Sequence, residues 1–187
     1  DVIKVEPLEG DPSRATGPFP DDLPHPDKSG LFLYLNANKR GVTLDYSSRT
    51  GRSLLDKLVA WADIVIENNL PSRAGELGLG WGRLREVNPK LVLTSITPFG
   101  QTGPDRDVPA EELTLFAMSG RMYIHGQPGR EPLRYAPDTS WFQIGATAAV
   151  ATMGALFASR RFGIGQQVDI SGLEALAGNV DTRTLQF

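Results

Sequence analysis

The chain has 187 residues, of which 40% are hydrophobic and 22% charged, and its formal net charge is −3. These values are typical of a globular protein with a buried core, and they argue against disorder and, because no basic surface is indicated, against nucleic-acid binding. The absence of cysteine excludes disulfides, thiolate metal sites and a cysteine nucleophile, and it fits a cytoplasmic protein. His25 and His125 are the only histidines, so a multi-histidine metal site is not expected.

The N-terminal part of the chain predicts two strands joined by a loop. Residues 2–5 form a short apolar strand pattern, and residues 8–30 are rich in proline. Proline disrupts central sheets and helix interiors, so we expect residues 8–30 to form a long surface loop. Residues 31–35, Leu-Phe-Leu-Tyr-Leu, are typical of a second strand.

The following residues predict one β-α-β unit. Residues 42–44 form its first strand, residues 51–62 an amphipathic helix, and residues 63–67 a strand buried on both faces. The second strand leads into Asn68-Asn69-Leu70. In open α/β sheets, ligands bind at the carboxyl ends of the strands, so we expect a site at this edge.

The rest of the chain continues the α/β pattern. A strand at residues 91–96 leads into a loop rich in glycine and proline, which we expect to face the same crevice. Residues 142–161 predict a long helix rich in small residues, and we interpret it as buried in preference to membrane-spanning. The other predicted elements are helical segments at residues 71–81, 84–87 and 111–119, turns at 121–137, a strand at 167–170, and a helix that contains Glu174 and is capped by Ser171.

Short motifs distributed along the whole chain resemble those of one known family. They are Asp1-Val-Ile-Lys-Val-Glu-Pro7, Asn38-Lys-Arg-Gly-Val-Thr-Leu-Asp45, Ala62-Asp-Ile-Val-Ile-Glu-Asn68, Leu77-Gly-Leu-Gly80, Asn88-Pro-Lys-Leu-Val92, Phe99-Gly-Gln-Thr-Gly-Pro104, Ser119-Gly120 and Gly163-Ile-Gly-Gln-Gln-Val-Asp169. In order and spacing, this set resembles the class III CoA-transferase (CaiB/BaiF) family, which includes formyl-CoA transferases, carnitine CoA-transferases and acyl-CoA racemases.

The resemblance implies a Rossmann-like large domain, an α/β fold in which helices flank a parallel sheet. Residues 1–170 would be most of this CoA-binding domain without its opening strand and helix, and residues 171–187 would begin the helix that leads to a small domain. We therefore expect the chain to be part of a longer protein. The resemblance further implies an interlocked homodimer, or pairing with a second CoA-transferase half.

The activity implied by the resemblance is transfer of CoA from an acyl-CoA donor to a carboxylic acid. A carboxylate nucleophile would attack the thioester, form an acyl anhydride, and then carry CoA as an enzyme thioester. This chemistry requires neither a metal nor a redox cofactor. Residue by residue, the family's CoA contacts correspond to Leu44, Asp45, Tyr46 and Ser47, and to Asn68, Asn69 and Leu70.

The chain departs from the family pattern at several CoA-binding positions. Asn69 stands where the family often has phenylalanine, and Glu76 and Pro7 stand where formyl-CoA transferases have arginines. Other cations would then have to hold the CoA phosphates, and the candidates are Lys39, Arg40 and Arg73.

The expected catalytic aspartate is displaced. Gap-free counting from Gly163 places its position on Trp141, while Asp138 lies three residues earlier. Asp138 is either the nucleophile, with its carboxylate in the crevice, or an N-cap of the following helix. In the second case the chain is a catalytically degenerate half, with Trp141 filling the pocket. A third alternative is an acyl-CoA racemase, in which Glu111 and Glu112 occupy the acid/base position, although acidic residues also favour a solvated helix start.

Overall fold

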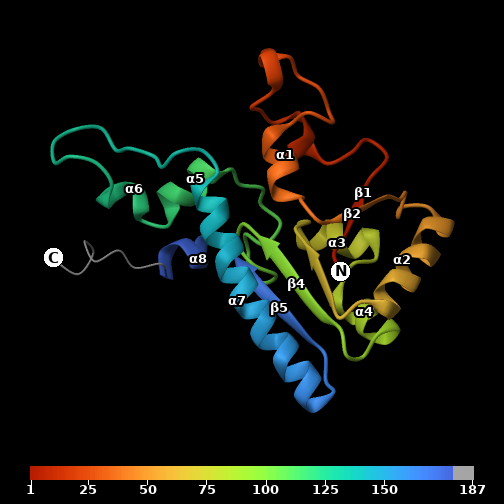
Figure 1. Ribbon diagram of the computed structural model, residues 1–187. Coiled ribbons are helices and arrows are strands. Elements are labelled where there is room, and N and C mark those ends of the chain that lie inside the picture. The colour runs from red at the N-terminus through yellow and green to blue at the C-terminus, as the bar shows by residue number, and fades with distance from the viewer. Residues whose placement is uncertain (179–187) are drawn as a thin grey trace. The chain divides into compact units, whose positions relative to one another are not determined.

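The protein is a mixed α/β structure in which helices flank parallel strands, as the sequence predicts (Figure 1). The structure, a computed structural model, describes residues 1–178 and divides into two compact units, residues 1–55 and 56–187. The division falls within helix α2 (Arg49–Trp61). Each unit has its own parallel sheet.

The first unit is built on two parallel strands. Strand β1 pairs with β2 from Ile3 opposite Arg40 to Glu6 opposite Thr43. The elements are β1 (Ile3–Glu6), two short 3-10 helices η1 (Pro12–Ala15) and η2 (Pro20–Asp22), α1 (Gly30–Leu35) and β2 (Arg40–Thr43).

Helix α1 corrects the prediction of a strand at residues 31–35. The Ser29 hydroxyl caps the helix by accepting a hydrogen bond from the Phe32 backbone N–H at 3.1 Å. Of the five apolar and aromatic residues, only Phe32 is buried, so one helical face contacts the core and the others face solvent. The uninterrupted apolar pattern is therefore not that of a buried strand.

The proline-rich residues 8–30 form a loop with short 3-10 turns, as predicted, and Arg14 anchors this loop. Its guanidinium donates to the carboxylate of Glu6, with Nε 2.7 Å from Oε2 and Nη2 3.0 Å from Oε1. The same guanidinium lies 3.9 Å from the centroid of the Phe32 ring. One side chain thus ties the loop both to β1 and to α1.

The second unit has three parallel strands in the order β3–β4–β5. Strand β4 lies in the middle, and its residues Val92, Leu93, Thr94 and Ser95 are buried. The elements are β3 (Ile64–Glu67), α3 (Pro71–Leu77), α4 (Trp81–Val87), β4 (Val92–Thr97), α5 (Glu112–Met118), α6 (Arg121–Ile124), α7 (Thr139–Phe162), β5 (Gln166–Ser171) and α8 (Gly172–Gly178).

The strands at either end of α2 belong to different sheets, which corrects the prediction of a single β-α-β unit. Within the described residues β2 pairs with β1, whereas β3 pairs with β4. Strand β3 is also less covered than predicted, because the Ile66 side chain is 62% exposed. An edge strand in this part of the chain produces the same run of branched residues as a central strand.

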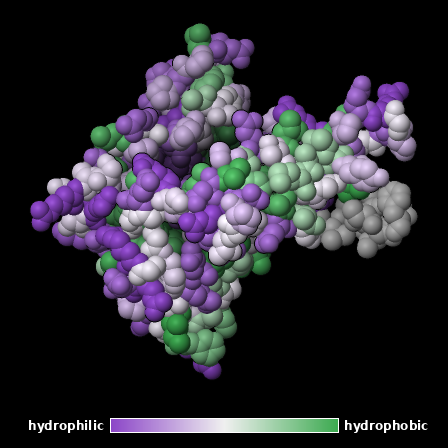
Figure 2. All heavy atoms as spheres, turned by 180° about the vertical axis from the view of Figure 1, so that it is seen from behind, coloured by the Kyte–Doolittle hydropathy of each residue, from purple (hydrophilic) through white to green (hydrophobic). Residues whose placement is uncertain are grey.

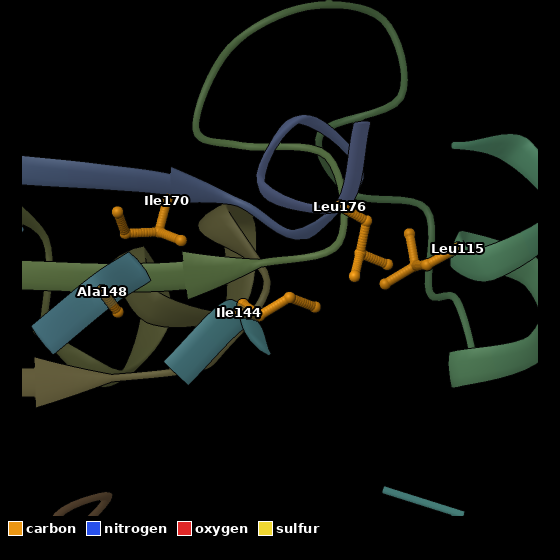
Figure 3. Packing of buried hydrophobic residues seen from close by; sticks show 5 residues of the cluster. All are labelled: Leu115, Ile144, Ala148, Ile170 and Leu176. Carbon is orange, nitrogen blue, oxygen red and sulfur yellow. The ribbon is translucent and has the colours of Figure 1, made fainter. Parts of the chain in front are cut away.

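Helix α7 packs one face against the second unit's sheet and neighbouring helices. Its buried residues recur every three or four positions, at Ser140, Ile144, Ala148, Thr152, Ala155 and Ser159. Ile144 and Ala148 form a cluster with Leu115, Ile170 and Leu176, in which Ile144, Leu115 and Leu176 point toward one another (Figure 3). This cluster fixes the first turns of α7 beside α5 and α8.

The prediction that this helix is buried holds for one face only. By length and composition α7 could cross a membrane, and only 22% of its most apolar 18-residue window is buried. Val150 and Phe157 are exposed on its outer side. Phe162, which ends α7, and Ile164 shortly after it are also exposed. Apolar residues gather at the lower tip of the surface in Figure 2.

Helix α8 begins as predicted. The Ser171 hydroxyl accepts a hydrogen bond from the Glu174 backbone N–H at 3.3 Å. The helix is described to Gly178, and residues 179–187 of the predicted segment 171–187 lie outside the described residues. That this segment leads to a small domain stays a prediction.

Candidate functional site at the carboxyl ends of the strands

Buried polar atoms without hydrogen-bond partners gather at one end of the second unit. Glu67 ends β3, Thr97 ends β4 and Gln101 follows β4, while Ser140 and Gln143 belong to the first turns of α7. Among the described residues, these five account for every buried side-chain N or O atom that lacks a partner. Because an unpaired buried polar atom is costly, this edge is the strongest candidate for a site completed by other groups.

The loop after β4 is fastened to the same edge by Asp169 on β5. The Gln101 backbone N–H donates to both carboxylate oxygens of Asp169, at 3.2 and 3.0 Å. Gly100 has φ +86°, and a Cβ there would lie 3.5 Å from the Asp169 oxygens. Glycine thus allows the close turn that brings the loop to the strand. Asp169 therefore holds the loop after β4 to strand β5.

The other end of the loop caps helix α3. The carboxylate of Asp107 accepts hydrogen bonds from the Ser72 backbone N–H at 2.7 Å and from the Ser72 hydroxyl at 2.8 Å. These bonds, with a smaller contribution from Arg106, lower the pKa of Asp107. The first turn of α3, which follows Asn68-Asn69-Leu70, is therefore already occupied by a carboxylate.

The CoA-contact residues predicted after β3 differ in what they present. Asn68 is exposed, whereas Asn69 turns back and donates its backbone N–H at 2.9 Å and its side-chain amide at 3.1 Å to Glu67 Oε2. Leu70 is half-buried and precedes α3 as its N-cap. Of these three residues, Asn68 alone offers an exposed polar side chain.

In the first unit, the four residues predicted to contact CoA follow β2. The Leu44 side chain is buried, Tyr46 is half-buried, and Asp45 and Ser47 are exposed. The hydrogen bond from the Ser47 hydroxyl, with those from the Ser47 and Ser48 backbone N–H groups, lowers the pKa of Asp45 in spite of an opposing effect of desolvation. Asp45 is thus an ordered, ionised carboxylate at the surface of a tight turn.

A close backbone approach shapes this turn. A Cβ at Gly51 would lie 1.8 Å from the Asp45 carbonyl oxygen, which no side chain tolerates. The Ser48 hydroxyl accepts from the Gly51 N–H at 3.0 Å and begins α2. Gly51 therefore fixes how Asp45 and its neighbours enter the helix.

Asp138 stands immediately before α7 with φ +66°, in the left-handed region, and is half-buried. The sequence left open whether it caps the helix, and its side chain makes no capping hydrogen bond in the described structure. Glu112, at the start of α5, supplies the cap instead. Its Oε2 accepts from the Asp138 N–H at 3.0 Å and its Oε1 from the Ser140 N–H at 2.8 Å.

A cleft of about 230 Å³ adjoins this contact, and its lining residues are Glu111, Glu112, Leu113, Phe116, Arg134, Tyr135 and Ser140. Trp141, the residue at the gap-free catalytic position, is not among them, and its side chain is 40% exposed. The cleft wall is aromatic, with the Phe116 and Tyr135 rings 4.6 Å apart. His125 packs against both rings, which agrees with a structural role at the end of α6.

A larger cleft of about 380 Å³ lies at the opposite end of the second unit's sheet. Trp61, Asp63, Asn88, Lys90 and Arg160 are among its lining residues, and the Asp63 and Arg160 side chains form an exposed ion pair at 3.4 Å. The residues Asp63 and Lys90 precede β3 and β4, so this cleft is remote from the carboxyl ends of the strands.

The cations considered for the CoA phosphates have local partners. The Lys39 ammonium donates to the Asn36 side chain at 3.0 Å, Arg40 lies 3.9 Å from Asp1, and Arg73 pairs with Glu76 at 2.8 Å. All these pairs are exposed, so a phosphate could displace them at small cost. Among the described residues no group of three or more His, Asp or Glu side chains is arranged to hold a metal ion.

Comparison with known proteins places these features in context. The model of CoA-transferase family III matches residues 1–186. The chain is 41% identical over 178 residues to the succinyl-CoA:(R)-benzylsuccinate CoA-transferase subunit BbsE of Thauera aromatica, covering 95% of this chain and 43% of that protein. It is 34% identical over 190 residues to the succinate–glutarate CoA-transferase of Agrobacterium fabrum, covering 100% and 48%.

Among solved structures, the chain matches a CAIB/BAIF family protein from Brucella suis. The TM-score is 0.89 and the sequence identity 33%, over 99% of this chain and 49% of that one. The chain therefore spans about half the length of the relatives that it matches.

Proposed function

The chain belongs to CoA-transferase family III, and from this premise we propose that the whole protein moves CoA from an acyl-CoA thioester to a carboxylic acid. The relatives described above are named as transferases that use succinyl-CoA, benzylsuccinate, succinate or glutarate. Acyl-CoA and a carboxylic acid are accordingly the substrates, and the chemistry needs no metal or redox cofactor.

The observation that carries the proposal is that the Asp138 side chain forms no capping hydrogen bond. Its carboxylate is not used to cap α7, because Glu112 accepts the hydrogen bonds from the first turn of that helix. Trp141 does not line the adjoining cleft. Asp138 does not line this cleft either, so the assignment of Asp138 as the nucleophile rests on its carboxylate being left free of the capping role that a degenerate site would give it.

The proposed reaction proceeds through covalent intermediates on Asp138. Its carboxylate attacks the donor thioester carbonyl, forms a mixed anhydride and releases the CoA thiolate. The thiolate then attacks the aspartyl carbonyl, releases the donor acid and leaves an aspartyl-CoA thioester. The acceptor carboxylate repeats the two steps in reverse order, which regenerates Asp138 and yields the acceptor acyl-CoA.

We assign separate CoA contacts to two turns, one that follows β2 in the first unit and one that follows β3 in the second. Asp45, Tyr46, Ser47 and Asn68 carry polar groups that are exposed or half-buried. Leu44, Asn69 and Leu70 would contribute through their backbone or through shape, since the Leu44 side chain is buried and the Asn69 amide is bonded to Glu67.

The test is chemical trapping in the intact protein. Incubation with a panel of acyl-CoAs and hydroxylamine, followed by peptide mass spectrometry, should reveal a hydroxamate on Asp138. Asp138→Asn should abolish the label, while Asp105→Asn, which changes an exposed loop carboxylate, should keep it. A protein that transfers CoA between acids without modification at Asp138 would refute this assignment.

A second candidate is a non-catalytic half that pairs with an active one. It is favoured by Trp141 at the gap-free catalytic position and by the relative from Thauera aromatica, which is named as a subunit. The two proposals differ in assembly: the first predicts an interlocked homodimer in the cytoplasm, and the second a heteromer. Native mass spectrometry of the intact protein, isolated with its natural partners, distinguishes one subunit type from two.

A racemase is the third alternative, and it would use an acid/base group without a covalent adduct. Its candidate Glu112 is engaged by two backbone N–H groups, which leaves that carboxylate poorly placed to exchange a substrate proton. Racemisation of a chiral acyl-CoA with no hydroxamate would support this alternative.

A further inference from the structure

We propose that Glu112 is a positioning residue that keeps the carboxylate of Asp138 available for reaction, an inference that rests on the function proposed for Asp138. Glu112 is the first residue of α5, and its two carboxylate oxygens accept from the N–H groups of Asp138 and Ser140. One side chain on α5 thus accepts hydrogen bonds from both N–H groups at the start of α7.

Both N–H donors lie at the N-terminus of α7, where an aspartate side chain usually forms the cap. Asp138 is the N-cap residue of α7, and Ser140 is the second residue of the helix. An aspartate at an N-cap ordinarily turns its own carboxylate onto the N–H of the second or third helical residue. Glu112 occupies the Ser140 N–H that Asp138 would otherwise use, and the Asp138 side chain makes no capping bond.

The second hydrogen bond fixes the backbone at Asp138. Its φ of +66° is uncommon for a residue with a side chain and is disfavoured by sterics. The bond from the Asp138 N–H to Glu112 at 3.0 Å holds that conformation. The two N–H groups that Glu112 binds lie at the start of the long helix α7, where the helix carries a partial positive charge that attracts a carboxylate.

A cleft borders the contact between Glu112 and Ser140. Both residues line this cleft of about 230 Å³, whereas Asp138 is not among its lining residues. The buried Phe116 forms part of the wall, and the core contact of Leu115 fixes α5. Because both oxygens of Glu112 accept from backbone N–H groups at the start of α7, we assign its effect on the reaction to the placement of Asp138.

The experiment compares Glu112→Gln and Glu112→Leu with Glu86→Gln in the intact protein. Glu86 is an exposed glutamate on α4 that lines neither cleft, so its variant is a matched control for charge. Three quantities are measured: the rate of hydroxamate formation at Asp138 with an acyl-CoA, the Kd for CoA, and the Tm. Glutamine keeps one of the two acceptor oxygens, whereas leucine keeps neither.

We expect Glu112→Leu to slow acylation of Asp138 about a hundredfold, because a small misplacement of a reacting group has an effect of this size. Glu112→Gln should slow it about tenfold, because a neutral amide forms weaker hydrogen bonds than a carboxylate. Glu86→Gln should match the wild type. The Kd for CoA should change by no more than about twofold in any variant, since the hydrogen bonds of the Glu112 carboxylate go to Asp138 and Ser140 and not to the turns assigned to CoA.

Three results would overturn the inference in distinguishable ways. Acylation in Glu112→Leu at the wild-type rate would show that Glu112 has no role in placing Asp138. Loss of both CoA binding and acylation in both Glu112 variants, together with a collapse of the Tm, would show that Glu112 only supports the fold. Absence of a hydroxamate on Asp138 in the wild type removes the proposed nucleophile, and with it the role of Glu112.

Discussion

Two buried glutamates occupy the same place in different units, since Glu6 ends β1 and Glu67 ends β3. Their exposed fractions are nearly equal, at 6% and 7%. Glu6 has partners on both oxygens, because Arg14 donates two hydrogen bonds and the Asp11 N–H donates a third. Glu67 accepts only at Oε2, from Asn69, and its Oε1 is buried without a partner in the described structure.

The difference separates a structural carboxylate from a candidate functional one. The hydrogen bond from Arg14 lowers the pKa of Glu6 in spite of burial. Such a pair is complete within its own unit. Glu67 Oε1 lies at an edge where the side-chain oxygens of Thr97 and Ser140 are also buried without hydrogen-bond partners in the described structure. A ligand or another part of the protein can supply such partners.

The largest effect should come from removing the partner of Glu6. Arg14→Met keeps an aliphatic side chain over Phe32 but leaves the buried Glu6 carboxylate without its cationic partner, and only the hydrogen bond from the Asp11 N–H remains. Breaking a buried ion pair in this way costs about 3 kcal/mol. Hydrogen exchange in the intact protein should therefore show a lower opening free energy for peptides from residues 1–55.

Arg40→Met is the control for this variant. Arg40 is on β2 in the same unit, and its pair with Asp1 at 3.9 Å is exposed on both sides. It should change the opening free energy by less than about 1 kcal/mol. Equal effects of the two substitutions would mean that Glu6 needs no partner, and the contrast with Glu67 would disappear.

The second prediction concerns the stability of residues 1–55 at acidic pH. Burial alone would raise the pKa of Asp11, but hydrogen bonds from Lys4 and Ser13 outweigh it and lower the pKa to about 2, from a usual value of 3.8. A carboxyl whose pKa is lowered on folding stabilises the protein above its unfolded pKa, and this contribution is lost as the pH falls through the folded pKa. Residues 1–55 should lose up to about 2 kcal/mol between pH 4 and 2.

Hydrogen exchange at several pH values, corrected for the intrinsic exchange rates, measures this loss. Asp11→Asn should be less stable near neutral pH and should show a flatter dependence below pH 4. An unchanged slope in Asp11→Asn would assign the acid sensitivity to other carboxyls, of which Glu6 is the first candidate because its pKa is also lowered.

The third prediction compares the two glutamates directly. Glu6→Gln removes a charge that Arg14 needs and should destabilise residues 1–55 by about 2 kcal/mol, since hydrogen bonds between charged groups are the stronger ones. Glu67→Gln keeps an acceptor for Asn69 and relieves a buried charge, so the opening free energy of the peptide around β3 should change by less than about 1 kcal/mol. A larger loss at Glu67 than at Glu6 would contradict the comparison.

Long, strongly patterned elements of the fold were predictable from the sequence. The strands β4 and β5 and the helices α5 and α7 lie close to their predicted positions, because their apolar spacing spans enough residues to define them. Helix α1 differs from the predicted strand because five consecutive apolar residues show neither helical nor strand periodicity. The hydrogen bond that caps the helix at Ser29 favours the helix. The separation of β2 from β3 depends on strand partners, which adjacency in the sequence does not determine.

The contacts of the candidate site were less predictable, since they join residues far apart in the chain. Glu112 accepts from the N–H of a residue 26 positions later, and Asp107 accepts from Ser72, 35 positions earlier. Capping rules read from sequence consider only local side chains. They therefore suggested Asp138 itself as the cap, and gave no signal for Glu112 or Asp107. The motifs located the edge of the sheet, but not the side chains that organise it.

The smallest expected effect is at Asp169, a carboxylate at the same edge as Glu67 whose two oxygens have a partner within its own unit. Asp169→Asn weakens the bonds from the Gln101 N–H, and because Asp169 is exposed the cost should be about 0.5 kcal/mol or less. The change should be local, with faster hydrogen exchange in peptides that contain Gln101 and unchanged exchange in α7. Asp105→Asn, in the same loop, should leave both unchanged. Faster exchange across the whole sheet would instead mean that Asp169 supports the core, and that a carboxylate with complete partners can matter as much at this edge as Glu6 does in β1.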